Sequence, residues 1–84
     1  MFVFDTQRQA AAFYFRRSRG GDVEALERLR EVLTRAQNTR ESGGEADGSI
    51  DQALWTALRD YGRAERLVRA REHAVIDLLG EDAY

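Results

Sequence analysis

One side of a predicted helix in the C-terminal part of the chain combines an aromatic ring with guanidinium groups. This face consists of Trp55, Arg59, Arg63, Arg66, Arg69 and His73. Residues three or four apart share one side of a helix, and arginines beside an aromatic ring can contact phosphate groups or bases. Residues 49–79 balance five arginines with five acidic residues, however, so a solvated face with ion pairs is the favoured interpretation. The acidic surface of a partner protein could use the same arginines.

The densest basic run in the chain is Arg16-Arg17-Ser18-Arg19. Arg16, Arg17 and Arg19, together with the Arg59–Arg69 face, support an alternative hypothesis, a small nucleic-acid-binding protein. Cations are also expected at the C-terminal end of a helix, where they offset the helix dipole, and we favour that role. With 13 basic and 15 acidic residues the net charge is −2, so no overall positive field attracts a polyanion.

The residue types that catalysis and metal binding require are scarce. The chain has no cysteine and a single histidine, which excludes thiolate chemistry and most zinc sites. His73 and Asp77 stand four residues apart, but two ligands are too few for a metal site. Gly43-Gly44 lacks the lysine and the hydroxyl of a P-loop. We therefore predict no catalytic residue, no metal, no cofactor and no enzymatic activity.

An amphipathic helix over residues 49–79 must position the arginine face. Apolar side chains recur along this segment at alternating steps of three and four residues. Ser49 is suited to cap the helix, with Gln52 completing a capping box, and Gly80 offers a C-terminal stop. Gly62 is the weak point, and we favour one continuous helix of about 46 Å over two helices that break there.

A second helix is predicted over residues 22–40, with Asp22 as its N-cap. A polar, glycine-containing loop over residues 41–48, which we expect to be flexible, joins it to the longer helix. The two helices should pack antiparallel as a hairpin, in the manner of a short coiled coil. The shorter helix spans only about 28 Å, so part of the longer one lacks cover. The side chains left over are Val68, Val75, Leu78 and Leu79. Either the first segment, folding back at Gly20-Gly21, or a second protomer must cover them.

The N-terminal segment is predicted to be a helix over residues 6–18, capped by Asp5 or Thr6. Phe13-Tyr14-Phe15 favours a strand, so an N-terminal β-hairpin of residues 1–4 with 11–16 is the alternative. The connection of that hairpin lacks glycine and asparagine, which counts against it. The first 19 residues hold five of the eight aromatic residues, and clustered aromatics are common anchors of protein interfaces.

These observations predict an all-α fold in a single domain over residues 1–84. It consists of an antiparallel helical hairpin with a long C-terminal helix and a short aromatic-rich N-terminal helix. The predicted function is a non-catalytic protein–protein interaction module, a small regulator, adaptor or inhibitor. The expected partner-binding residues are Phe2, Phe4, Phe13, Tyr14, Trp55, Arg59, Arg63 and Arg66.

The expected partner is another protein, and we also expect a homodimer. The longest apolar run is six residues, far below the roughly 20 that span a bilayer, so no membrane partner is expected. No stretch resembles a signal peptide, and the expected location is the cytoplasm.

Overall fold

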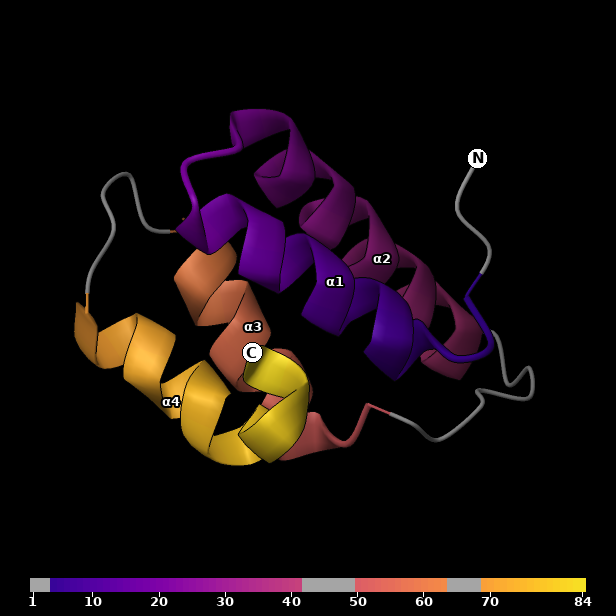
Figure 1. Ribbon diagram of the computed structural model, residues 1–84. Coiled ribbons are helices and arrows are strands. Elements are labelled where there is room, and N and C mark those ends of the chain that lie inside the picture. Colours follow the sequence, from indigo (N-terminus) through magenta and orange to yellow (C-terminus); the bar gives the residue numbers. More distant parts are fainter. Residues whose placement is uncertain (1–3, 42–49, 64–68) are drawn as a thin grey trace.

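The computed structural model describes residues 4–41, 50–63 and 69–84, which form four α-helices and one 3-10 helix (Figure 1). The helices are α1 (Gln7–Arg19), α2 (Val23–Glu41), α3 (Gln52–Arg63) and α4 (Arg69–Leu79), followed by the 3-10 helix η1 (Gly80–Ala83). The predicted all-α class is confirmed. The alternative N-terminal β-hairpin is wrong, because residues 11–16 lie inside α1, whose apolar side chains are covered by neighbouring helices on more than one side.

Short polar side chains determine where three of these helices begin. Thr6 Oγ1, Asp22 Oδ1 and Asp51 Oδ1 each accept a hydrogen bond from the backbone N–H three residues later, at 3.1, 3.1 and 2.8 Å. These are N-caps, which satisfy amide groups that have no partner within the helix. The third cap corrects the prediction, because α3 starts one residue after Asp51 and not at Ser49. Ser49 and the loop predicted over residues 41–48, apart from residue 41 at the end of α2, lie outside the described residues.

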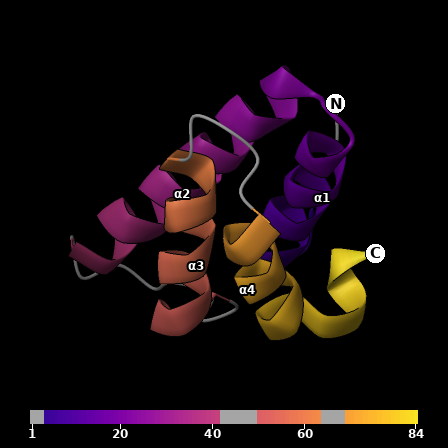
Figure 2. The same ribbon diagram turned by 90° about the vertical axis from the view of Figure 1, so that its left-hand side faces the viewer.

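The continuous helix predicted over residues 49–79 is wrong. The segment forms two helices, α3 and α4, that pack side by side (Figure 2). The longest extent of the molecule is 34 Å, shorter than the roughly 46 Å that one such helix would span. Arg71 Nη1 donates to the carbonyl oxygen of Asp60 at 3.1 Å, which satisfies one of the carbonyls left unpaired where α3 ends. Folding back buries apolar side chains on α4 that a straight helix would leave exposed.

The chain itself covers the apolar end of the predicted long helix. α1 folds back on α2 at Gly20-Gly21, where Gly21 adopts a φ of 99°, and α1 also packs against η1. Val75 and Leu79 are 0% and 3% exposed, Leu78 is 41% exposed, and Val68 lies outside the described residues. The difference in helix length that suggested a second protomer is therefore absent. The largest fully buried side chains are Phe15, Leu29, Ile50, Leu54, Leu58 and Val75.

A hydrogen-bonded polar pair lies in the core where α1 meets α3. Ser18 Oγ donates its proton to the carbonyl oxygen of Phe15 at 2.8 Å, so the hydroxyl of Tyr61 donates to Ser18 Oγ at 2.6 Å. The ring of Tyr61 meets that of Phe15 edge-on, with centroids 4.8 Å apart. Burial raises the pKa of Tyr61 above its ordinary value of 10.0, and Ser18, which can turn to donate to the ionised tyrosine, partly opposes this shift.

Candidate partner-binding site

Trp55 attaches α3 to α2. Its indole Nε1 donates to the carbonyl oxygen of Leu33 at 3.0 Å, and nearer the start of α2 Arg30 Nε donates to the carbonyl oxygen of Gly62 at 2.9 Å. Because the two contacts follow opposite orders along the two helices, α2 and α3 run antiparallel, as predicted. The indole ring stays partly exposed, since Trp55 lies off the apolar stripe that α3 buries.

A groove of about 330 Å³ opens along the contact between α2 and α3. We call it the Trp55 groove. It is lined by Arg30, Leu33, Thr34, Gln37 and Asn38 of α2 and by Trp55, Arg59, Gly62 and Arg63 of α3. The lining therefore combines an aromatic ring, three guanidinium groups and short polar side chains. No acidic residue is among the described residues that line it.

The three arginines of the Trp55 groove differ in how many of their donors are used. Arg30 is anchored, because both its Nε and its Nη2 donate to Gly62. Arg59 lies over the indole of Trp55, with its Cζ 5.3 Å from the ring centroid, and Nη2 donates to the exposed Asp60 at 3.3 Å. Its buried Nε finds no acceptor among the described residues. Arg63 is exposed and forms no hydrogen bond or ion pair within the described part of the chain.

The structure brings only part of the predicted arginine face together in the groove. Trp55, Arg59 and Arg63 lie together in the groove, whereas Arg69 and His73 belong to α4 and do not line it. The prediction that Arg69 and His73 share a face with Trp55 is therefore wrong, because it depends on one continuous helix. Arg66 lies outside the described residues, and so does Phe2.

Sequence reasoning missed Arg30, which comes from a different helix. The signal that could have found it is Gly62, treated in the sequence only as a weak point of a helix. A Cβ built on Gly62 would lie 3.7 Å from Arg30 Cγ, so the absence of a side chain leaves room for the arginine to cross the helix contact. Antiparallel pairing of residues 22–40 with residues 49–79 places the two positions opposite each other.

The predicted aromatic residues near the N-terminus form a separate cluster. The ring centroids of Phe4, Phe13 and Tyr14 lie 5.2 to 5.8 Å apart, and all three side chains are partly exposed. Phe4 lies beside Val32 of α2, whereas Trp55 lies beside Thr34. Two residues apart on a helix means about 200° of rotation, so the structure places the ring cluster and the Trp55 groove on opposite sides of α2.

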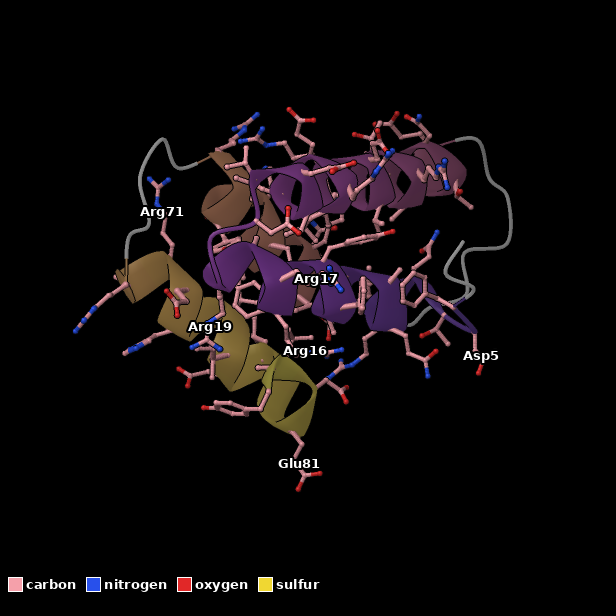
Figure 3. All side chains as sticks on the ribbon, turned by 45° about the horizontal axis from the view of Figure 1, so that its top comes forward. Asp5, Arg16, Arg17, Arg19, Arg71 and Glu81 are labelled. Carbon is pink, nitrogen blue, oxygen red and sulfur yellow. The ribbon has the colours of Figure 1, made fainter. Side chains whose placement is uncertain are left out.

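The arginines proposed for nucleic-acid binding contact other parts of the chain. Arg16 Nη1 donates to a backbone carbonyl of η1 at 2.6 Å, and Arg19 Nε pairs with Glu72 Oε1 at 2.6 Å. Arg17 lies 3.9 Å from a carboxylate oxygen of Asp22. Figure 3 shows Arg16 and Arg19 on the side of α1 that faces α4 and η1. These side chains tie the C-terminal turn to α1.

Comparison of the chain with protein-family models, with curated proteins and with solved structures finds no match. Among the residues that the structure describes, no group of three or more histidine, aspartate or glutamate side chains is placed to hold a metal ion. Within the same ranges, no helix is both long enough and apolar enough to cross a bilayer.

Proposed function

We propose that this chain is a non-catalytic protein-interaction module, a small regulator, adaptor or inhibitor that binds a partner protein through the Trp55 groove. One observation carries the proposal: a partly exposed indole lies beside the guanidinium group of Arg59 and shares its groove with Arg63. Both arginines retain donors without acceptors in the described residues. Tryptophan and arginine are the residue types that most often dominate the free energy of protein association.

The distribution of charge supports a protein partner over a nucleic acid. The chain carries a net charge of −2, and Arg16 and Arg19 form intramolecular contacts with the C-terminal turn. Nucleic-acid binding gains its affinity from many phosphate contacts at once. Within the groove a polyanion would meet three guanidinium groups, and this number suffices for a local ion pair with a protein surface.

Site-specific photo-cross-linking in cells of the native host tests this function. A photoreactive amino acid at position 63 should form a covalent adduct with another protein, identified by mass spectrometry. The matched control is position 27, because Glu27 is exposed on α2 and does not line the groove. Adducts of equal yield from both positions, or none from position 63, would contradict the proposal.

A further inference from the structure

Building on the proposed function, we infer that the Trp55 groove binds an extended acidic segment of its partner, with an apolar residue followed at two-residue steps by two carboxylates. The apolar side chain packs beside Trp55, and the two carboxylates pair with Arg59 and Arg63. The proposal places no requirement on the sequence or fold of the partner outside this segment.

The spacing of the three groove residues determines this order. Trp55, Arg59 and Arg63 follow one another at steps of one helical turn, about 6 Å along α3. In an extended peptide, side chains two residues apart lie on the same face and are separated by about 6.6 Å. An extended segment therefore presents three side chains to these three residues in sequence. The groove, at about 330 Å³, accommodates the side chains of a few extended residues.

The charge and the unused donors determine the chemistry of the ligand. Three guanidinium groups line the groove, and no acidic residue of the described ranges lines it with them. The contact between Arg59 and its neighbour Asp60 is exposed and monodentate, at 3.3 Å, so an incoming carboxylate can replace it. A carboxylate accepts two parallel hydrogen bonds from a guanidinium fork, so it can pair with the terminal Nη1 and Nη2 groups of Arg59, whereas the Nε is buried.

The state of the indole favours a peptide over a nucleotide base. Base binding by tryptophan depends on an open ring face for stacking, and Arg59 already covers one face of the Trp55 ring at 5.3 Å. The rim carries Asn38, whose carboxamide forms no hydrogen bond within the described residues and can pair with a peptide backbone. A chain of net charge −2 also repels a short acidic segment less than a long polyanion, because the segment carries fewer charges.

Intrinsic fluorescence gives a direct measurement, because Trp55 is the single tryptophan of the chain. The probe is the peptide acetyl-Gly-Leu-Ser-Glu-Ser-Glu-Gly-amide, titrated to millimolar concentration. Two matched peptides serve as controls, one with glutamine for both glutamates and one of equal composition with the two glutamates adjacent. We expect the probe to shift the Trp55 emission and to bind at least tenfold more tightly than the glutamine peptide, with the adjacent-glutamate peptide in between.

Protein variants show which arginines are responsible. Arg63→Gln should weaken binding of the probe about tenfold, and Arg59→Gln should do so as well. Arg69→Gln makes the same charge change at an exposed position outside the groove and should leave the affinity unchanged. Circular dichroism of each variant checks that the helices are retained, and the exposed Arg63 can be replaced with little effect on packing.

Three outcomes would overturn the inference. They are equal affinity for the glutamate and glutamine peptides, no emission change with any peptide, and a twelve-residue oligothymidylate that binds more tightly than the probe. Failure here is distinguishable from failure of the proposed function. An adduct at position 63 whose partner site lacks acidic residues would leave the interaction module intact and refute the acidic segment.

Discussion

In the described part of the chain, several arginine side chains donate hydrogen bonds to carbonyl oxygens at the ends of helices that are far from them in sequence. Those that donate to distant backbone carbonyl oxygens are Arg8, Arg16, Arg19, Arg30 and Arg71. The last carbonyls of a helix lack partners within it, and a planar guanidinium can reach two acceptors at once. Arg59 and Arg63 have no such role. Because they also line the Trp55 groove, we assign these two arginines to a partner.

Tyr61 makes the stability of the protein sensitive to alkaline pH. Burial raises its pKa in the folded state above 10.0, so between pH 10 and that raised value the unfolded chain binds fewer protons. Stability is therefore fully present below about pH 10 and falls as the pH rises through the folded pKa. The chain has no lysine, so no lysine ammonium group loses its proton in the same pH range as Tyr61.

Thermal unfolding from pH 8 to 11 measures this effect. The wild-type midpoint should stay level to about pH 10 and then fall, whereas Tyr61→Phe should remove the fall. At pH 8 the variant should be less stable by about 1 kcal/mol, because it loses the hydrogen bond to Ser18. Tyr84→Phe is the control, since Tyr84 is 80% exposed. Parallel alkaline curves for the wild type and Tyr61→Phe would refute the assignment.

At the scale of the helices, Arg19 links α1 to both α4 and η1. Its guanidinium pairs with Glu72, donates to the carbonyl oxygen of Ala83 at 3.3 Å and lies 5.7 Å from the ring centroid of Phe15. Arg19→Gln should lower the free energy of unfolding by about 1–2 kcal/mol, because it leaves the partly buried Glu72 without its partner.

Urea denaturation followed by circular dichroism measures the effect of Arg19→Gln. The matched control is Arg69→Gln, at an exposed position of α4, which should change the free energy of unfolding by less than about 0.5 kcal/mol. Equal losses in both variants would show that the pairing of Arg19 contributes nothing specific to the contact between the helices.

The sequence predicts helices whose ends carry local signals. Predicted helices over residues 6–18 and 22–40 correspond to α1 (Gln7–Arg19) and α2 (Val23–Glu41), because polar caps and a glycine pair mark their boundaries. The break between α3 and α4 has no comparable signal, since the chain lacks proline and Gly62 lies inside α3. The break is favoured because it lets α4 bury its apolar side chains against the rest of the chain. The periodicity of one segment does not show how that segment packs against the others.

In the candidate site, too, the sequence predicts what lies on one helix and misses what depends on packing between helices. Helical spacing groups Trp55, Arg59 and Arg63 from the sequence alone, since all three lie on one helix. Arg30 enters from α2, so finding it requires the relative position of two helices. Arg69 shares that face only if residues 49–79 form one continuous helix, and the structure has two helices there.

At the scale of the whole molecule, the predicted homodimer stays a prediction, with different support from that expected. The buried Val75 and Leu79 no longer need a second protomer. The partly exposed ring cluster of Phe4, Phe13 and Tyr14 remains as a surface on which two copies can pack. A dimer formed through three partly exposed rings would bury far less area than one formed through the uncovered end of a long helix. Any self-association should therefore be weak.

Sedimentation equilibrium can distinguish association through the ring cluster from association through the C-terminal helix. We expect the 9.6 kDa monomer at micromolar concentration and a dimer only near millimolar concentration. Phe13→Ala should prevent that dimer, because it removes the ring that contacts both of the other two in the cluster. Leu78→Ser should not, because the exposed Leu78 lies on α4 and does not belong to the cluster. A tight dimer that Leu78→Ser dissociates would instead return the interface to the C-terminal helix, as the sequence first indicated.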